Sequence, residues 1–300
     1  GDDIVVAVHE APAEPVDMEL IVCPPEPGKE RVKDEYRDLA DGRLLRKRLT
    51  EMVFVFGGPA AATIGPCLAN LNQVINFINN RFMQWHVDRG ALLAHAAGVA
   101  MNGRGLALAG LASRGKSTLT LHLLGKGLDY VTNDRLLLVR TAGGGLRMLG
   151  LPKFPRVNPG TLLNNERLAG LLPAEERAKL AGKSRAELWG IEQKYDVDVN
   201  EFFAGRFALG ADVRAVAVLN WRLEGGPARV APVKLAERPE LLGALRKSPG
   251  VHYYAGAGRE RPDCSGAAYL ERLGDVTVLE IGGGVDFEAA AAACVGWLGS

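Results

Sequence analysis

The residues Gly110 to Ser117 carry the strongest chemical signal in this chain of 300 residues. They read Gly-Leu-Ala-Ser-Arg-Gly-Lys-Ser and match Gly-x-x-x-x-Gly-Lys-Ser/Thr, a phosphate-binding loop when it follows a strand and opens a helix. In such a loop, backbone amides and the helix N-terminus attract a phosphate. Lys116 would reach the β- and γ-phosphates of a nucleotide, and the Ser117 hydroxyl would bind Mg²⁺. The alternative is a glycine-rich turn that exposes an ordinary lysine.

Two further residues have types and spacings that suit a nucleotide site. Asp134 lies one helix and one return strand beyond Lys116, at the end of that expected strand, where a carboxylate could bind metal or accept a proton. The pair Asn133-Asp134 also suits a turn between two strands, which is the alternative. His95 lies just before the hairpin that leads into the loop. It could act in acid–base chemistry, although a histidine beside apolar residues is more often part of a core or a turn.

Two basic residues are candidates for contacts with a phosphoryl group. Lys153 and Arg156 flank prolines in a shaped loop over residues 150–162. Fixed cations near a phosphate-binding loop could stabilise the charge of a transferring phosphoryl group. The alternative is ordinary surface charge.

Alternating apolar runs and turn residues predict the elements that must position these candidates. Apolar runs over 96–101 and 105–109 flank Asn102-Gly103, the strongest short hairpin signal, and the second run leads into Gly110. Runs over 128–132 and 136–139 predict strands on either side of Asn133-Asp134. An apolar stripe predicts a helix over 67–85, and residues 29–50 are expected to form an exposed helix or a hairpin. The other expected elements are strands over 4–8, 20–23, 52–56, 146–149, 215–221 and 276–281, and helices within 173–190, 239–246 and 287–298.

Composition and charge limit the classes of protein to which the chain can belong. Hydrophobic residues make up 47% and charged residues 24%, which is typical of a globular protein. With 36 basic and 35 acidic residues, no overall field attracts nucleic acid or an anionic membrane. No apolar run approaches the ~20 residues that span a bilayer, and residues 1–20 are acidic, unlike a signal peptide. The four cysteines are far apart, so we expect reduced thiols in a cytoplasmic protein.

The string from His95 to Val99, the hairpin, the loop and the string from Tyr130 to Asp134 together resemble the catalytic domain of the HPr kinase/phosphorylase family. That family has a histidine before Gly-Val, then the loop lysine, then a pair of adjacent aspartates. Positions 95, 116, 133 and 134 of this chain reproduce the family's spacing between these residues. The resemblance covers residues 90–160 best. The stretches 151–160 and 195–198 are more similar to the HPr-kinase-related proteins often labelled kinase B.

The resemblance implies an α/β fold with a P-loop core and a mixed sheet, like HPr kinase and phosphoenolpyruvate carboxykinase. This core would occupy residues 66–300, preceded by an N-terminal extension or small lobe over 1–65. The implied activity is ATP- and Mg²⁺-dependent phosphoryl transfer to a serine hydroxyl of a protein or peptide, which includes the setting of modified-peptide biosynthesis. Kinases of a small-molecule hydroxyl such as free serine, and a nucleotide-binding sensor or scaffold without transfer, are the alternatives. The expected partners are ATP and the acceptor. No nucleic-acid or membrane partner is expected, and whether the chain forms a homo-oligomer is left open.

The resemblance also implies a role for each matched residue. Asp134 matches the aspartate that faces the substrate hydroxyl as base, and His95 matches the histidine beside the aspartate pair. Lys116 would act on the phosphates, and Ser117, Asn133 and Asp134 would bind the metal. The expected nucleotide-binding positions are Gly110, Ser113, Arg114, Gly115, Lys116, Ser117 and Thr118.

Two departures from the family pattern bear on activity. Asn133 replaces the first aspartate of the pair, which keeps a carbonyl oxygen for Mg²⁺ but removes a negative charge. Arg147 stands where the family has a glutamate, so a second acidic ligand is missing there. Asp196 or Asp198 could replace it, because a spacing of two places both on one face of a strand; a solvated strand edge is the alternative. The departures favour the sensor, whereas His95 and Asp134 favour the kinase.

Overall fold

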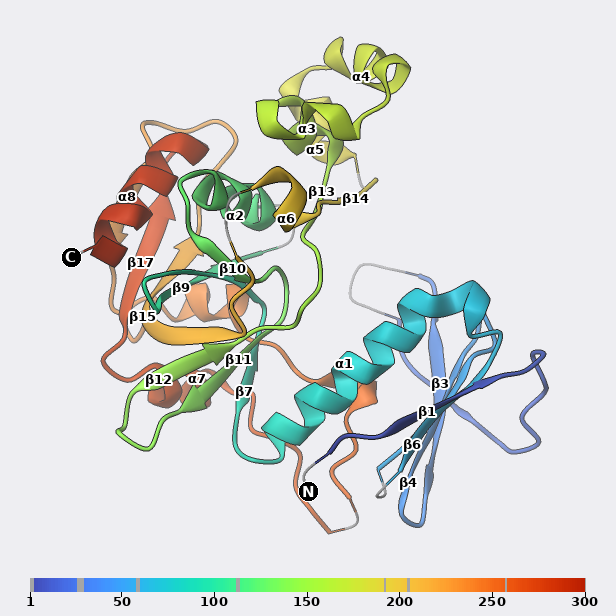
Figure 1. The fold of residues 1–300 in the computed structure, drawn as a ribbon. Coiled ribbons are helices and arrows are strands. Elements are labelled where there is room, and N and C mark those ends of the chain that lie inside the picture. Colours follow the sequence, from blue (N-terminus) through green and yellow to red (C-terminus); the bar gives the residue numbers. More distant parts are fainter. Residues whose placement is uncertain are drawn as a thin grey trace. The chain divides into compact units, whose positions relative to one another are not determined.

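The computed structural model describes residues 3–25, 30–57, 60–111, 114–191, 193–203, 206–256 and 258–299, and it is a mixed α/β structure (Figure 1). The chain divides into two compact units. The first comprises residues 1–90 and 248–263, and the second comprises residues 91–247 and 264–300. This division differs from the one expected at residue 65. The reason is that helix α1 (Leu71–Val87) packs on the sheet of the first unit, to which the segment 248–263 also returns.

The second unit is built on a nine-stranded mixed sheet, as expected from the hairpin. Its long central strand β15 pairs in parallel with β9 and β17 and antiparallel with β12. Strands β8 and β9 form the expected hairpin, in which Asn102 and Gly103 both have positive φ, as its tight turn requires. The strands are β7 (Leu92–Ala94), β8 (Ala96–Met101), β9 (Arg104–Gly110), β10 (Asp129–Thr132), β11 (Leu136–Arg140), β12 (Leu146–Leu149), β15 (Gly210–Leu219), β16 (Arg229–Pro232) and β17 (Thr277–Gly282).

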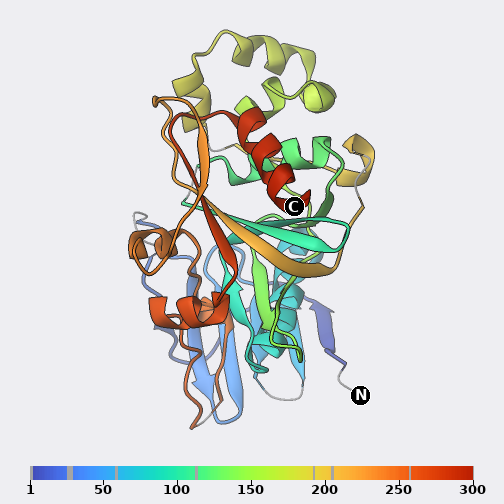
Figure 2. The same ribbon diagram turned by 90° about the vertical axis from the view of Figure 1, so that its left-hand side faces the viewer.

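Helices cover both faces of this sheet, because successive side chains of each strand enter different cores. Along β9, Leu106 and Leu108 belong to one core, and Ala107 and Ala109 belong to the other. Helices α2 (Lys116–Gly125) and α8 (Phe287–Gly299) contribute to the first core and lie side by side (Figure 2). Helix α7 (Gly266–Leu273) and the 3-10 helix η3 (Pro239–Ala244) contribute to the second. The helix expected over 239–246 is thus a 3-10 helix.

Short elements connect β12 to β15. The region expected to be a shaped loop over 150–162 contains a short strand and the start of a helix, and the helical stretch expected within 173–190 forms two helices. The elements are β13 (Arg156–Val157), α3 (Pro159–Leu163), η2 (Glu166–Leu171), α4 (Ala174–Ala181), α5 (Arg185–Gly190), β14 (Tyr195–Asp196) and α6 (Val199–Phe202).

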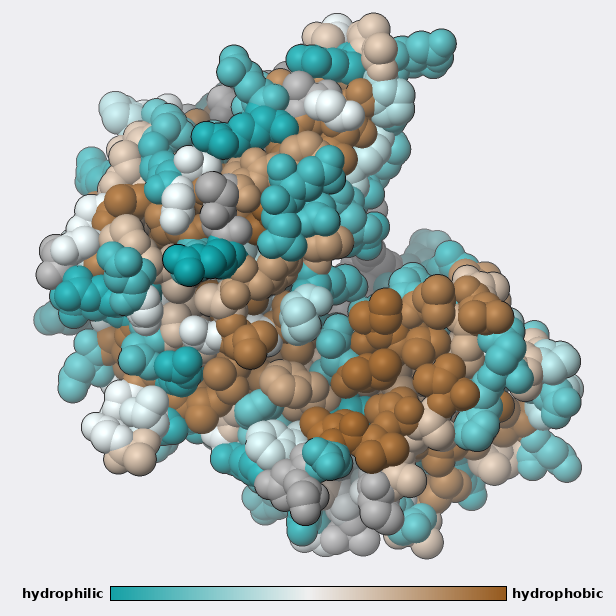
Figure 3. Space-filling model, viewed as in Figure 1, coloured by the Kyte–Doolittle hydropathy of each residue, from teal (hydrophilic) through white to brown (hydrophobic). Residues whose placement is uncertain are grey.

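The first unit is a six-stranded sheet with helix α1 on one face. Residues 29–50 contain the hairpin of β3 and β4, one of the two expected structures. Phe77 of α1 packs against Phe54 and Phe56, with ring centroids 4.7 and 5.7 Å apart. Other apolar side chains of α1 stay exposed and gather on the surface in Figure 3. The elements are β1 (Val6–Glu10), β2 (Ile21–Val22), β3 (Asp34–Leu39), β4 (Gly42–Lys47), β5 (Val53–Phe56), β6 (Ala61–Gly65), η1 (Leu68–Asn70) and η4 (Gly250–His252).

Two further findings concern the whole described chain. Its helices include none that combines the length and the apolar character needed to cross a membrane. All four cysteines are free thiols, as expected.

Candidate functional site

The candidate residues lie where neighbouring strands of the large sheet end. Strand β9 ends at Gly110, and β8 runs antiparallel to both β9 and β10. The start of β8, which follows His95, therefore meets the ends of β9 and β10. Asp134 comes two residues after β10 ends. The topology thus brings the segment from Gly110 to Ser117, the histidine and the aspartate to one edge of the sheet.

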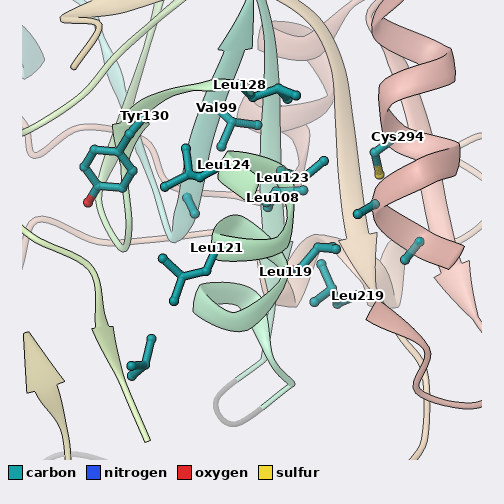
Figure 4. Packing of buried hydrophobic residues seen from close by; sticks show 14 of the residues in the cluster. Val99, Leu108, Leu119, Leu121, Leu123, Leu124, Leu128, Tyr130, Leu219 and Cys294 are labelled. Atoms are coloured by element: carbon teal, nitrogen blue, oxygen red, sulfur yellow. The ribbon is translucent and has the colours of Figure 1, made fainter. Parts of the chain in front are cut away.

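Helix α2 starts at Lys116 and is fixed by its leucines. Figure 4 shows Leu119 and Leu123 on the side of α2 that is turned toward α8, and Cys294 on the side of α8 that faces α2. The leucines of α2 that belong to this core are less than 2% exposed. This packing holds the start of α2, and with it Lys116, at the edge of the sheet.

Lys116, His95 and Asp134 form one polar cluster. The Nζ atom of Lys116 is 2.8 Å from Nε2 of His95, and Nε2 is 3.0 Å from Oδ1 of Asp134. The Lys116 ammonium and the Asp134 carboxylate are 3.8 Å apart. Burial lowers the pKa of Lys116, and the charge of Asp134 opposes that change. Burial raises the pKa of Asp134, but the hydrogen bond from His95 and the charge of Lys116 outweigh it and hold that pKa below its usual range. The carboxylate is therefore ionised at neutral pH.

The two contacts of His95 Nε2 exclude each other. A protonated Nε2 donates a hydrogen bond to Asp134, whereas an unprotonated Nε2 accepts one from the Lys116 ammonium. A ligand that draws Lys116 away from His95 would leave Nε2 available to donate to Asp134. The arrangement links the position of the lysine to the hydrogen bond that the aspartate receives.

Two aromatic residues hold the chain at Arg114 and Gly115, just before helix α2. Trp221 donates a hydrogen bond from Nε1 to the Arg114 carbonyl (2.8 Å), and Arg114 donates one to the Trp221 carbonyl (2.7 Å). Gly115 has a φ of +82°, and a Cβ atom there would lie 2.7 Å from the ring of Phe287. The rings of Trp221 and Phe287 are packed edge to face, 4.9 Å apart. The sequence analysis missed both aromatic residues; the signals were that Trp221 ends the strand expected over 215–221 and that Phe287 begins the last expected helix.

The remaining loop positions have different surroundings. Gly110 ends β9 opposite Leu219 of β15. Ser117 is half-buried in the first turn of α2. The Thr118 hydroxyl lies 2.7 Å from the hydroxyl of Thr161 in α3, so it faces that helix. Ser113 lies outside the described residues.

Lys153 interacts electrostatically with Asp134, and Arg156 pairs with an aspartate. The hydroxyl of Tyr130 on β10 donates to the Lys153 carbonyl (2.5 Å). Burial and the charge of Arg156 lower the pKa of Lys153, while Asp196 and Asp134 oppose this. Arg156 and Asp196 face each other across the β13–β14 pair, with Nε and Oδ1 3.4 Å apart. Arg156 thus has an acidic partner, and the charge of Lys153 interacts with the charges of Arg156, Asp196 and Asp134.

Asp198 and Arg147 have structural partners. The Asp198 carboxylate accepts a hydrogen bond from the amide of Asn200 (2.9 Å) at the start of α6. Asp196 ends β14, so the two aspartates do not share a strand face; this differs from the expectation, because the chain turns into α6 between them. Arg147 on β12 pairs with Asp212 of β15 at 3.0 Å.

Ser117, Asn133 and Asp134 carry oxygen atoms of the chemical kinds that Mg²⁺ accepts. Oδ1 of Asn133 is buried and has no hydrogen-bond partner. With Ser117 and Asp134 it offers the hydroxyl, amide and carboxylate oxygens that Mg²⁺ accepts. Within the described ranges, no three His, Cys, Asp or Glu side chains group into a metal site. These donors would thus hold Mg²⁺ together with nucleotide phosphates, as is usual for this ion.

Comparisons with known proteins give little beyond this geometry. No protein-family model matches the chain, and no curated protein matches it. A solved structure that does match is described as the structure of the Hpr(Ser) kinase/phosphatase from Coxiella burnetii. It is 12% identical and has a TM-score of 0.32, over 68% of this chain and 93% of that chain. The function of this chain must therefore be inferred from its own site.

Proposed function

We propose that this chain transfers the γ-phosphoryl group of ATP to a hydroxyl group, in the first instance that of a serine in a protein or peptide. The observation that carries the proposal is the cluster in which the loop lysine, Lys116, lies 2.8 Å from His95 and 3.8 Å from Asp134. In-line phosphoryl transfer requires positioning and charge neutralisation more than covalent chemistry. A buried cation beside an ionised carboxylate supplies both requirements at one place.

Lys116 and the start of α2 are suited to bind the nucleotide. The ammonium group would leave His95 and contact the β- and γ-phosphates, and the first amides of α2 would donate to the same oxygens. Bound Mg²⁺, held by Ser117, Asn133 and Asp134, would neutralise part of the phosphate charge. Arg114 and Gly115 keep the loop in place through their contacts with Trp221 and Phe287.

Asp134 is suited to act on the acceptor. Its ionised carboxylate would accept a hydrogen bond from the acceptor hydroxyl and so orient the oxygen toward the γ-phosphorus. As the new oxygen–phosphorus bond forms and the bond to ADP breaks, the hydroxyl proton passes to the carboxylate. The low pKa of Asp134 makes it a weak base, so this transfer would come late. His95, released from Lys116, would donate to Asp134 and fix its orientation.

The proposal is tested with Lys116→Ala and a matched control, Lys126→Ala. Lys126 follows the same helix and pairs with Glu288 at 2.7 Å. At about 100 Kd, Mg–ATP should stabilise the parent and the control by about 2.7 kcal/mol and should not stabilise Lys116→Ala. Equal stabilisation of Lys116→Ala would overturn the proposed nucleotide site.

The acceptor is tested separately by following γ-phosphate transfer from labelled ATP. Serine peptides, free serine and a cell extract are supplied in parallel, with Lys116→Ala as the blank. Label on a peptide or protein supports the proposal, and label on free serine supports a small-molecule kinase. Nucleotide binding by the parent without turnover in any arm would favour a sensor and contradict the proposal.

A further inference from the structure

A bend over residues 132–135 joins β10 to β11 and carries Asp134. Leu136, the first residue of β11, pairs with Ala94 of β7, which directly precedes His95. Because this pairing is antiparallel, the bend ends at the level of His95. Strand pairing therefore places the end of the bend beside the histidine of the site, but it does not determine the path of the residues in the middle.

The position of the Asp134 carboxylate depends on the backbone of this bend. Its side chain is 57% exposed, yet its Oδ1 atom lies 3.0 Å from Nε2 of His95 and 3.8 Å from Nζ of Lys116. Holding an exposed side chain in one geometry costs conformational entropy, which opposes ion pairs at a surface. Packing of the side chain itself offers little compensation at this exposure. A stable contact between Asp134 and His95 therefore requires that the backbone of residue 134 be held in place.

The hydroxyl group of Thr132 closes the bend. It donates a hydrogen bond to the Arg135 carbonyl (3.0 Å), across Asn133 and Asp134, and it accepts one from the Leu151 amide (3.4 Å). A threonine hydroxyl has one proton to donate and lone pairs to accept, so both bonds can form together. Thr132 is only 2% exposed, so water competes little for either bond. One side chain thus ties the two ends of the bend to each other and to residue 151.

The segment that contains Leu151 gives this hydroxyl a fixed anchor. A Cβ atom at Gly150 would lie 2.0 Å from the carbonyl oxygen of Val131, so the segment lies directly against β10. The hydroxyl of Tyr130, on the same strand, donates to the Lys153 carbonyl (2.5 Å). Residues on both sides of Leu151 are therefore held against β10 by contacts that do not involve the bend.

We propose that Thr132 is a positioning residue for phosphoryl transfer, whose hydroxyl holds the bend in the shape that places the Asp134 carboxylate beside His95. The inference rests on the proposed function and adds a buried residue that contacts neither the nucleotide nor the acceptor. Without the hydroxyl, the middle of the bend would be free to shift while the strands on either side stay paired. Transfer tolerates little of such movement, because a misplacement of about 1 Å can cost about 10²-fold in rate.

The test compares Thr132→Val, which keeps the shape of the side chain, with Thr132→Ser, which keeps the hydroxyl. Single-turnover transfer from labelled ATP is measured with the serine peptides, free serine and cell extract of the acceptor assay. Each rate is divided by the amount of protein that binds Mg–AMP-PNP, so unfolded protein is not counted. We expect Thr132→Val to transfer about 10- to 10²-fold more slowly with AMP-PNP affinity largely retained, and Thr132→Ser to stay close to the parent.

The control is Thr63→Val, which makes the same chemical change in the core of the first unit. Thr63 is 0% exposed, and its hydroxyl lies 3.8 Å from Sγ of Cys67. We expect this variant to transfer at the parental rate. An equal loss of transfer in Thr63→Val would show a general effect of removing a buried hydroxyl and would overturn the inference.

A second comparison asks whether Thr132 acts through Asp134. In the Asp134→Asn background, Thr132→Val should cause little further loss of transfer, because the carboxylate that the hydroxyl positions is already absent. A merely structural role would lower the rate by the same factor in both backgrounds, since independent effects add in free energy. Equal factors would therefore overturn the inference.

The remaining outcomes separate this inference from the proposed function. If the parent transfers phosphate and Thr132→Val does so equally fast, or if Thr132→Ser loses as much as Thr132→Val, the inference is overturned and the proposed function stands. A loss of AMP-PNP affinity as large as the loss of transfer would also overturn it. Thr132→Ala replaces Thr132→Val if the latter does not fold, and failure of both to fold would make Thr132 a structural residue. If the parent binds AMP-PNP but transfers no phosphate in any arm, the proposed function fails, and the inference fails with it.

Discussion

Replacing Gly115 by alanine adds one methyl group just before the start of helix α2, beside the ring of Phe287. Gly115 has a φ of +82°, in the left-handed region, where an L-residue costs about 1–2 kcal/mol. The new Cβ would lie 2.7 Å from Cε1 and Cζ of Phe287, and relief of such overpacking typically costs about 1–3 kcal/mol. We therefore expect Gly115→Ala to lower the free energy of unfolding by about 2–5 kcal/mol.

The chain offers a matched control that separates the two costs. Gly103 has a φ of +79°, but a Cβ atom there would meet nothing within 4 Å. Gly103→Ala should therefore cost only the backbone term of about 1–2 kcal/mol. Phe287→Leu makes room beside Gly115, so in the double variant the penalty of Gly115→Ala should fall toward that of Gly103→Ala.

The assay is urea unfolding of the four proteins and the parent, followed by tryptophan fluorescence. Gly115→Ala should lose about 1–3 kcal/mol more than Gly103→Ala, and Phe287→Leu should recover most of that difference. Equal losses for the two glycine variants would refute the reasoning. So would additive effects of Gly115→Ala and Phe287→Leu, because residues in contact should show coupling.

Three further predictions concern the polar cluster. Asn133→Asp should lower the Mg²⁺ concentration needed for nucleotide binding, because a charged oxygen binds this ion better than an amide; an unchanged titration would place residue 133 away from the metal. Nucleotide affinity should be lost at alkaline pH, when Lys116 loses its proton. In Asp134→Asn this loss should occur at lower pH, because Asp134 raises the pKa of Lys116 and burial then lowers it unopposed. Coinciding profiles of affinity against pH for Asp134→Asn and the parent would contradict this. His95→Ala should reduce the rate of transfer less than Asp134→Asn does, because His95 positions the carboxylate; a larger loss in single-turnover transfer would make His95 the more direct participant.

Local signals predicted the strands around the site. Asn-Gly at 102–103 specifies a tight hairpin turn whichever other elements surround it, and the structure has that turn between β8 and β9. Local patterns made Lys116, Asp134 and His95 candidates but left a turn or core role open for the last two, and only the family resemblance grouped all three, which lie together in the structure. They can meet because each of them follows or precedes one of the adjacent strands β8, β9 and β10.

The residues that support the site could not be predicted in this way. Trp221 reaches Arg114 because β15 pairs in parallel with β9, a long-range pairing that no local pattern specifies. Phe287 meets Gly115 through the packing of α8 against α2. Each contact joins segments that are distant in the sequence.

Helix α1 shows a limit of hydrophobic periodicity. The helix was predicted, and an apolar stripe that includes Leu71, Ile75 and Ile78 lies along it, but these three side chains are 42–55% exposed. The buried face instead contains Phe77 and Arg81. Both faces of the helix carry apolar residues, so packing of Phe77 against the rings of β5 decides which face is covered, and periodicity does not.

The most direct test of the kinase mechanism is single-turnover γ-phosphate transfer by Asp134→Asn, measured with nucleotide affinity in the same preparation. The substitution keeps the size of the side chain and removes its ability to accept a proton. Affinity at neutral pH should largely survive, because Lys116, Ser117, Asn133 and the loop backbone are intact and the new amide still offers Mg²⁺ an oxygen. Transfer should fall by about 10²–10⁴-fold, the usual contribution of a general base. Transfer at the parental rate would contradict the mechanism, and a joint loss of affinity and transfer would make Asp134 chiefly a metal ligand instead of the base.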